Sequence, residues 1–275
     1  MIVRCWGARG GIAVSGARYT RFGGDTCCIE VRDSENRIVI IDAGTGLRPL
    51  GDRMLEEGIL ECDQVFTHLH WDHLMGLPFF RVPIRGRVRV HGDPIEIPLR
   101  ECFKTVMAHP FFPVPFEDLF SGMEFIPQGD SFRLGNLDVK TVPLSHPGGG
   151  LGYRFEENGK SFVFLTDNEL SHVHGQGLAP QGYADFAKEA DLLVHDAEYL
   201  PSEYPSHVGW GHSHWMDAVD LAEAAEVKAL GLFHHGAGRK DVEVAAIVDS
   251  CREELKRRGA DIECFAMASE HVVRL

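Results

Sequence analysis

The heptapeptide 67–73, Thr-His-Leu-His-Trp-Asp-His, constrains the fold more than any other part of the chain. It places four potential metal ligands within six residues. Side chains repeat with period two along a strand, so a strand carrying His68 and His70 points both rings to the same side. If the chain then turns into a helix, Asp72 and His73 project in another direction. We therefore expect the first pair to hold one ion and the second pair to face another; the alternative is a polar loop whose histidines satisfy one another.

The composition is that of an ordinary soluble globular protein. The chain has 275 residues, of which 44% are hydrophobic and 25% charged. This length permits a substantial core, in one large domain or two small ones. The net charge of −14 disfavours a surface built to hold duplex nucleic acid, which depends on a basic footprint. It does not disfavour a small anionic substrate, because a bound dication dominates the local field.

The cysteines and the apolar segments bear on the compartment. The seven cysteines are odd in number and form no Cys-x-x-Cys pair, which predicts free thiols in a reducing environment. The first residues lack a basic region followed by an apolar run, so we see no signal peptide. No apolar stretch approaches the length of a membrane span. We expect a cytoplasmic protein that does not contact a membrane.

The first part of the chain has the pattern of strands with one helix. The expected elements are strands over 2–6, 27–31, 37–41 and 65–67 and a helix over 47–57. Asp42 follows the third of these strands and precedes glycines. It is either a simple turn or cap residue or a carboxylate that orients a metal-ligating histidine, and the metal-ligand motif downstream favours the second role. The glycine-rich run 7–11 lacks the spacing of a phosphate-binding loop.

Residues 78–130 are less regular and rich in Pro and Phe, and we expect them to be a variable segment around the substrate pocket. Within it, 87–90 fits a strand and 99–106 a helix. The stretch 109–116 cannot be a regular element, because its three prolines interrupt backbone hydrogen bonding. It is either a packed loop with an aromatic plug or a wall of the substrate pocket into which His109 reaches.

Strands and helices alternate in the remaining part. The expected strands cover 132–134, 137–143, 152–156, 161–165, 192–194, 229–233, 262–267 and 272–275, and the expected helices cover 183–190, 216–225 and a last one that ends at Gly259. Ser213 and Asp241 are the expected N-caps of the last two helices. One domain spanning 1–275, with two packed sheets flanked by helices, accounts for this order better than two separate folds.

A recurrent pattern places a ligand-type residue at the end of an apolar strand. It is found at His68 and His70, at His146, at Asp167, at Asp196 and at His234. Each of these alone is more simply a turn or cap residue. Strand ends that converge on one edge of a sandwich bring distant residues together, so five such ends predict a shared site.

The His-x-His-x-Asp-His motif, followed in order by a lone His, a lone Asp and a final His, resembles the metallo-β-lactamase superfamily over nearly the whole chain. The resemblance is strongest to the branch with ribonuclease Z and the small phosphodiesterases of phosphonate breakdown and cyclic-nucleotide hydrolysis. It implies an α/β (α+β) fold, a four-layer αββα sandwich, with two divalent ions per chain; we expect zinc, with manganese or iron as alternatives. The implied ligands are His68, His70 and His146 for one ion, Asp72, His73 and His234 for the other, and Asp167 between them. His235 adjoins His234, and alignment with the family's last motif favours His234.

Two further motifs resemble ribonuclease Z. The run 195–198, His-Asp-Ala-Glu, is similar to its His-Glu-Ala-Thr motif, and 211–213, Gly-His-Ser, to its His-Ser-Thr motif. The resemblance implies that Asp196 orients His212, which protonates the departing alkoxide. Two cations would lower the pKa of a bridging water, giving a hydroxide that attacks the phosphate, with Asp72 among the catalytic residues. Alternatively, Asp196 is a turn residue and His212 begins a helix.

The substrate expected from these motifs is a small phosphodiester, linear or cyclic. Ribonuclease Z clamps tRNA with a Gly/Pro/basic arm, and the sequence has no such basic insertion. The alternatives are a ribonuclease Z-like nuclease, a lactonase or thiolesterase on the same metals, and a non-catalytic binding protein, which the complete ligand set disfavours. A homodimer is expected by family resemblance alone.

Overall fold

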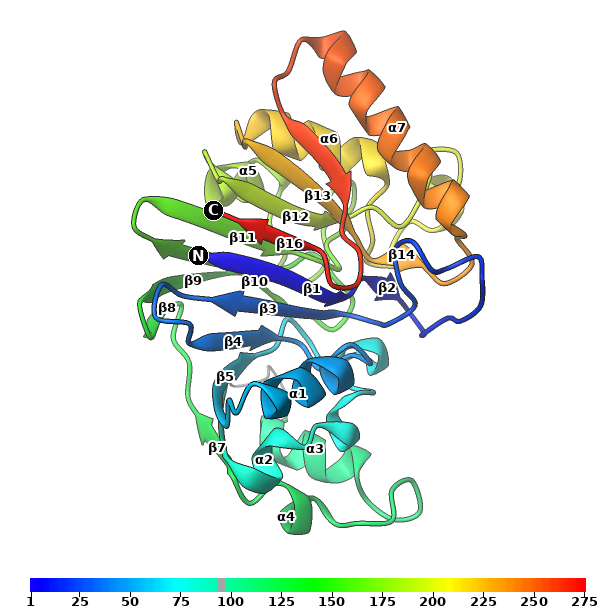
Figure 1. Ribbon diagram of the computed structural model, residues 1–275. Helices are drawn as coiled ribbons and strands as arrows, with labels where there is room; N and C mark the ends of the chain where they lie inside the picture. Colours follow the sequence, from blue (N-terminus) through cyan, green and yellow to red (C-terminus); the bar gives the residue numbers. More distant parts are fainter. Residues whose placement is uncertain (93–96) are drawn as a thin grey trace.

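The computed structural model, which describes residues 1–92 and 97–275, has four layers (Figure 1). Two seven-stranded sheets pack face to face, and helices cover the outer face of each sheet. This is the predicted αββα sandwich. None of the described helices is long and apolar enough to cross a membrane.

The first sheet has the strand order β16-β1-β3-β4-β5-β6-β7. Its strands from β16 to β4 pair antiparallel, and those from β4 to β7 pair parallel. The strands are β1 (Ile2–Gly7), β3 (Cys28–Arg32), β4 (Ile38–Ile41), β5 (Glu61–Val65), β6 (Arg87–His91), β7 (Met123–Ile126) and β16 (Val272–Arg274).

The second sheet has the order β15-β13-β12-β11-β10-β9-β8. It is parallel from β15 to β11 and antiparallel from β11 to β8. The strands are β8 (Ser131–Leu134), β9 (Leu137–Pro143), β10 (Leu151–Glu157), β11 (Lys160–Leu165), β12 (Leu192–Asp196), β13 (Ala229–Phe233) and β15 (Glu263–Ala266). A short parallel pair, β2 (Arg9–Gly10) with β14 (His235–Gly236), ties the glycine-rich run to the end of β13.

The helices divide between the two outer faces (Figure 1). Those on the first sheet are α1 (Leu47–Glu56), α2 (Val82–Arg85), α3 (Leu99–Val106) and α4 (Phe116–Leu119). Those on the second sheet are α5 (Pro180–Ala187), α6 (Trp215–Ala224) and α7 (Asp241–Arg258). The 3-10 turns are η1 (Trp71–His73), η2 (Leu77–Phe79) and η3 (Tyr204–Ser206).

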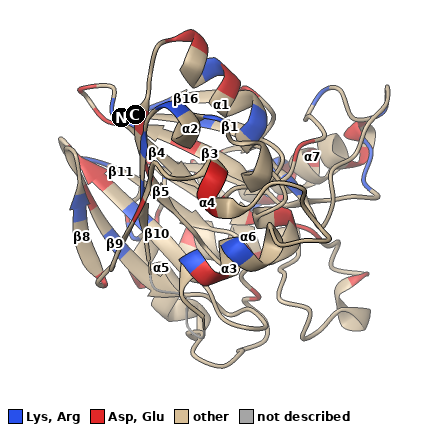
Figure 2. Ribbon diagram, turned by 90° about the horizontal axis from the view of Figure 1, so that it is seen from below, with Lys and Arg blue, Asp and Glu red and all other residues tan. Residues whose placement is uncertain are grey.

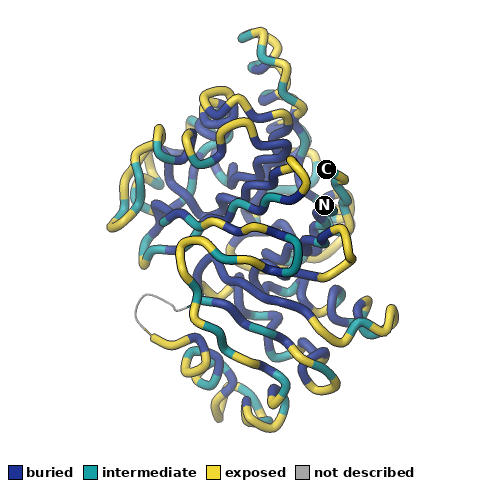
Figure 3. Tube along the Cα trace, turned by 90° about the vertical axis from the view of Figure 1, so that its left-hand side faces the viewer, coloured by how far each residue is buried: buried dark blue, intermediate teal, exposed yellow. Residues whose placement is uncertain are grey.

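Three apolar cores explain the layers. The central one lies between the sheets, where residues such as Val31 and Ile41 meet Phe155 and Phe164. The other two lie between each sheet and its helices. Central strands such as β4, β12 and β13 are therefore buried on both faces, and Figure 3 shows dark blue segments through the middle of the molecule. This double burial explains why several strands are continuous apolar runs.

The strand expected at 65–67 ends at Val65, so the prediction that His68 and His70 lie on a strand was wrong. The cause is Asp42. One of its oxygens accepts the Thr67 N–H at 2.7 Å and the other accepts the Thr67 hydroxyl at 2.8 Å, which draws the chain out of the sheet. The predicted turn into a helix is confirmed by η1.

Two predicted N-caps were also wrong. Helix α6 begins after His214, whose side chain accepts the N–H of Asp217. Ser213 instead donates its hydroxyl to the carbonyl of Asn168. Helix α7 begins after Lys240, so Asp241 is its first residue. Helix α5 spans Pro180–Ala187 rather than 183–190.

Candidate metal centre

The predicted ligands gather at one edge of the sandwich, beyond the carboxyl ends of the strands. They come from both sheets: the segment after β5 carries the heptapeptide, and β9, β11 and β13 are each followed by one further ligand. Those further ligands are His146, Asp167 and His234. A two-sheet fold thus brings together residues that are up to 166 positions apart, from His68 to His234.

Asp167 lies at the centre of the cluster. Its Oδ2 is 3.6 Å from Nε2 of His68, 3.4 Å from Nε2 of His234 and 3.9 Å from Nε2 of His146. Its Oδ1 is 3.4 Å from Nε2 of His73. One carboxylate therefore faces histidines of both predicted ligand groups, which is the position a bridging ligand needs.

The first group contains His68, His70 and His146, and their ligand atoms lie within 4.8 Å of one another. Nε2 of His146 is 2.9 Å from Nδ1 of His70. Two ring nitrogens this close either share a proton or bind one cation between them. His70 is exposed, so this group is open to solvent on one side.

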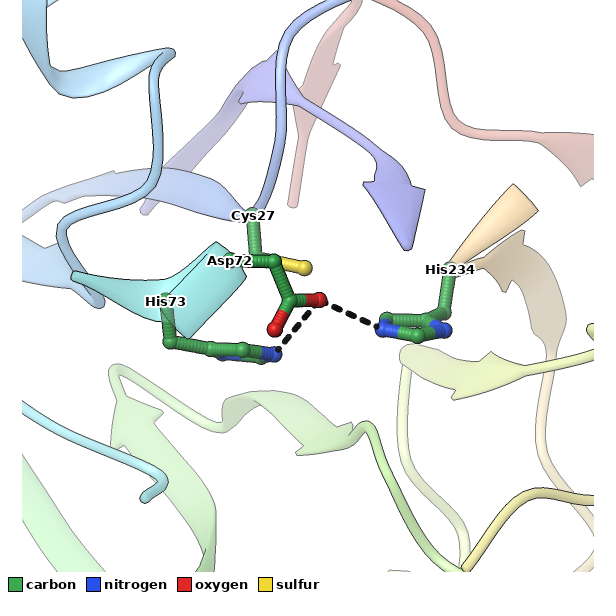
Figure 4. Close-up of side chains that lie close together, drawn as sticks. All are labelled: Cys27, Asp72, His73 and His234. Carbon is green, nitrogen blue, oxygen red and sulfur yellow. Dashed lines mark hydrogen bonds and ion pairs between the residues drawn. The ribbon is translucent and has the colours of Figure 1, made fainter. Parts of the chain in front are cut away.

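The second group contains Asp72, His73 and His234 (Figure 4). Oδ2 of Asp72 is 3.1 Å from Nε2 of His234 and 3.6 Å from Nε2 of His73. The same oxygen accepts the backbone N–H of Gly11 at 2.8 Å. The glycine-rich run 7–11 thus helps to hold the Asp72 carboxylate in place through a backbone N–H group.

Three of the histidines have their outward nitrogen occupied. In each, Nδ1 donates to an oxygen, which fixes the tautomer and leaves Nε2 to face the cluster. The pairs are His73 with Asp42 (2.8 Å), His146 with the carbonyl of Gly211 (2.9 Å) and His234 with Glu198 (2.9 Å).

The structure supports cation binding in two ways. Nε2 of His68 and Nε2 of His73 are buried and have no hydrogen-bond partner among the described residues, although buried polar groups are normally paired. In addition, although burial lowers the pKa of His73 and of His234, neighbouring acidic groups outweigh it and raise both well above the ordinary value: chiefly Cys27 and then Asp167 for His73, and chiefly Asp167 for His234. The acidic groups thus favour a positive charge at these two histidines. Bound divalent ions would provide that charge in place of protons.

The first group differs electrostatically from the second. Burial lowers the pKa of His146 to about 4, and burial together with the charge of His73 lowers the pKa of His68. Both rings are therefore neutral at neutral pH, the form in which imidazole binds metal.

His212 lies beside the second group. Its ring stacks on that of His234 with centroids 4.5 Å apart. Its Nδ1 is 3.8 Å from Asp196 and 3.7 Å from Glu198. Asp196 thus makes no hydrogen bond to His212, because its two oxygens accept the backbone N–H groups of Asn168 and Ser213. The motif at 195–198 predicts the acidic role for Asp196 alone, whereas the structure places Glu198 equally close to His212.

The loop that carries His212 is held by Glu169, which the sequence analysis did not single out. This buried carboxylate accepts hydrogen bonds from Tyr204, from His174 and from the backbone N–H groups of Gly209 and Gly211, at 2.6–2.8 Å. The two backbone bonds fix the main chain immediately before His212, and the two side-chain bonds hold Glu169 itself in place. No local sequence motif marks Glu169, because its partners lie up to 42 residues away.

Three residues of the site have left-handed backbone conformations. Asp42, Asp167 and His234 have φ of 64°, 56° and 55°. Such conformations are uncommon outside glycine and cost about 1–3 kcal/mol each. Their coincidence at the ends of three strands indicates that the surrounding structure holds these side chains in place.

The structure does not bring His109 to the cluster. The residue is exposed and is absent from the described lining of the pocket beside the first histidine group. That pocket, of about 230 Å³, is lined by side chains such as Phe66, Leu69, Leu99 and Leu151. The main chain of 148–150 closes one side of it.

The family model of the beta-lactamase superfamily domain matches residues 37–235, which include the heptapeptide, Asp167 and His234. The chain belongs to the beta-lactamase superfamily. A ribonuclease Z of Sulfolobus acidocaldarius is 26% identical over 239 residues, covering 71% of this chain and 77% of the relative.

Solved structures of similar fold cover the whole chain. Unliganded yeast PDE1 superposes with a TM-score of 0.76 at 13% identity, covering 100% of this chain and 99% of its own. A diphosphatase from the PhnP family superposes with a TM-score of 0.66 at 19% identity, covering 100% and 97%. These likenesses show that the same fold includes the residues outside 37–235.

Proposed function

We propose that this chain is a dinuclear metallohydrolase that cleaves a small phosphodiester, linear or cyclic. A metal-dependent phosphodiester hydrolase is supported by relatives named ribonuclease Z and by a structural neighbour that is a diphosphatase. The observation that carries the finer proposal is the position of His212, stacked on a predicted metal ligand and facing three carboxylates. We propose further that the whole chain acts as one catalytic domain.

The proposed ligands form two sets, one for each ion. His68, His70 and His146 would hold one and Asp72, His73 and His234 the other, with Asp167 between them. When bound, the two ions lower the pKa of a water and offset charge on the phosphate. The donor set of nitrogen and carboxylate oxygen suits zinc, manganese or iron.

His212 would protonate the leaving oxygen. Burial, with the positive charge of His234, lowers the pKa of His212, whereas Asp167 and Glu198 oppose this. The ring without substrate is therefore mostly neutral at neutral pH, and a bound phosphodiester anion would add negative charge beside it and shift its pKa back upward, toward the protonated form. We therefore assign the proton transfer to His212 and the support of its charge to Asp167 and Glu198, with Asp196 holding the main chain of Ser213 next to it.

The pocket beside the first histidine group supports a small organic substrate. Its lining is mostly apolar, and two metal-ligand candidates, His68 and His70, form part of its wall. A substituent of the phosphodiester could occupy this pocket while the phosphate lies at the cluster.

The test compares leaving groups in the His212→Ala variant. A general acid matters most when the leaving group is a poor one, so kcat on an alkyl phosphodiester should fall about 10²- to 10⁴-fold. The loss on bis(p-nitrophenyl) phosphate should be smaller, because nitrophenolate leaves without a proton. His207→Ala is the matched control, since His207 stacks on Tyr199 in the same region but lies outside the cluster. Equal losses on both substrates, at unchanged metal content, would contradict the role.

A ribonuclease Z-like nuclease is the second candidate, favoured by the names of the relatives. Against it, basic and acidic residues are interspersed along the described chain, as Figure 2 shows, and the net charge is −14. Binding of tRNA with a steep salt dependence would favour the nuclease, because phosphate contacts release counterions.

A further inference from the structure

The second histidine group contains a sulfur atom that the predicted ligand set leaves out. Cys27 directly precedes β3, and its side chain is buried. Its Sγ belongs with the ligand atoms of Asp72, His73 and His234, all within 4.8 Å of one another. Figure 4 shows the sulfur pointing toward the Asp72 carboxylate and the His234 ring, on the opposite side of that carboxylate from His73.

Among the described residues, the one hydrogen bond of the Cys27 thiol is weak. Sγ of Cys27 lies 3.5 Å from the carbonyl oxygen of Arg9, and thiols are weak donors. The backbone of Cys27 is held firmly, because its carbonyl accepts the N–H of Gly44 at 2.9 Å. The position of the sulfur beside Asp72, His73 and His234 is therefore set by a hydrogen-bonded main chain.

An independent observation indicates that this space takes a cation. Nε2 of His73 is fully buried, faces the same group and has no hydrogen-bond partner among the described residues. Its Nδ1 is committed to Asp42, so Nε2 is the nitrogen that offers a lone pair to a cation once the ring has released its second proton. A buried lone pair, a carboxylate and a thiol that converge on one space are the donors of a metal site.

We propose that Cys27 is a further protein ligand, besides the bridging Asp167, of the ion held by Asp72, His73 and His234. This inference rests on the proposed metal centre and makes it chemically asymmetric. On binding, the thiol releases its proton to solvent and the thiolate sulfur bonds to the metal. The first histidine group has no cysteine among its described members, so the two ions meet different ligands.

The asymmetry has a consequence for metal choice. A thiolate with imidazole favours zinc over manganese or magnesium, which prefer oxygen ligands. The second site should therefore retain zinc when manganese is in excess, whereas the first site should exchange more readily.

Cobalt substitution tests the proposal without relying on catalysis. Cobalt-loaded wild-type protein should show a near-ultraviolet thiolate-to-cobalt charge-transfer band in addition to visible ligand-field bands. Cys27→Ser should lose the first band and keep the second, which reports occupancy. Cys28→Ala is the matched control, because Cys28 packs in the core between the sheet and α1 and should leave both bands intact. A near-ultraviolet band that survives in Cys27→Ser, or that is missing from wild type, overturns the proposal.

A second measurement needs no variant, which guards against a Cys27→Ser chain that fails to fold. X-ray absorption of zinc-loaded wild-type protein should show sulfur at about 2.3 Å from zinc. A zinc environment of nitrogen and oxygen alone would refute sulfur ligation. Hydrolysis of bis(p-nitrophenyl) phosphate, assayed in parallel, separates the two proposals: sulfur ligation without hydrolysis defeats only the function, and hydrolysis without sulfur ligation defeats only the role of Cys27.

Discussion

Asp42 and His73 are joined by a 2.8 Å hydrogen bond between the aspartate Oδ2 and the histidine Nδ1. The same carboxylate binds the backbone and hydroxyl of Thr67. One buried side chain thus ends β5 early, sets the start of the heptapeptide and fixes the tautomer of one of its histidines. Burial raises the pKa of Asp42, although His73 and Thr67 oppose this.

Asp42→Asn should weaken metal binding without removing a ligand. The amide cannot accept the Nδ1 proton as a carboxylate does, so Nε2 of His73 becomes a poorer donor. Loss of such an orienting partner costs about 10- to 100-fold in metal affinity. Competition with a chelator measures the metal affinity. The control is Asp63→Asn, because Asp63 is a carboxylate on β5 that lies away from the cluster. Equal chelator sensitivity of both variants would speak against an orienting role.

Gly10→Ala should damage the second histidine group. A Cβ at Gly10 would lie 2.2 Å from ring atoms of His234, far inside van der Waals contact. The ring must move, so we expect at least a tenfold loss of affinity for one of the two ions, by analogy with other disturbed ligand supports. Gly238→Ala, whose Cβ would meet nothing within 4 Å, is the control for the substitution itself. Isothermal titration that still finds two tight ions in Gly10→Ala would contradict this.

The convergence of the candidate ligands could be predicted from sequence because each follows an apolar strand, and strand ends of a sandwich meet at an edge. Apart from Asp42, whose bond to His73 agrees with the orienting role expected from the sequence, the groups that hold these candidates in place could not be predicted. Glu198 lies in a quoted motif, yet only the structure shows that it bonds Nδ1 of His234 at 2.9 Å. Gly11 and Glu169 act through backbone contacts across 61 and 42 residues, which no local pattern encodes.

The errors at caps and strand ends have a shared physical cause. Ser213 is expected to cap a helix and Thr67 to lie in a strand because of their local sequence. Hydrogen bonds to residues distant in the sequence determine the conformation of both instead. Ser213 bonds the main chain of Asn168 and Leu170 instead of capping α6. The layered fold itself was predictable, since alternating apolar strands and helices leave few other arrangements.

Glu169→Gln should disturb the first histidine group from a distance. The amide presents an NH₂ to at least one of four donors, and a lost hydrogen bond to a charged group costs about 1.5–3 kcal/mol. Gly211 would shift, and its carbonyl holds Nδ1 of His146. We expect a lower Tm together with weaker binding of one ion in a two-step titration. Tyr204→Phe, which removes a single donor, should give a smaller effect; a Tm loss with unchanged titration would mean that Glu169 is structural only.

The contact of Asp63 with Arg89 predicts an acid-sensitive contribution to stability. Both carboxylate oxygens bind the guanidinium at 2.8 Å, and one also lies 2.7 Å from His91. Burial raises the pKa of Asp63, but these hydrogen bonds outweigh it and hold the value below the ordinary 3.8. A carboxylate with a depressed folded-state pKa stabilises fully above the unfolded value and loses its contribution as pH falls through the folded value.

Asp63→Asn should therefore destabilise the protein at pH 7 by about 1–3 kcal/mol, and the difference from wild type should shrink as pH falls below 3.8. Urea unfolding of chelator-treated protein at several pH values measures this, because removing metal keeps the acid loss of the histidine cluster out of the comparison. Glu61→Gln is the matched control: Glu61 contacts the same Arg89 at 3.5 Å from an exposed position, where an ion pair contributes about 0–1 kcal/mol. A difference between Asp63→Asn and wild type that persists unchanged at pH 3 would show that the geometry of the site, rather than the charge of Asp63, supplies the stability.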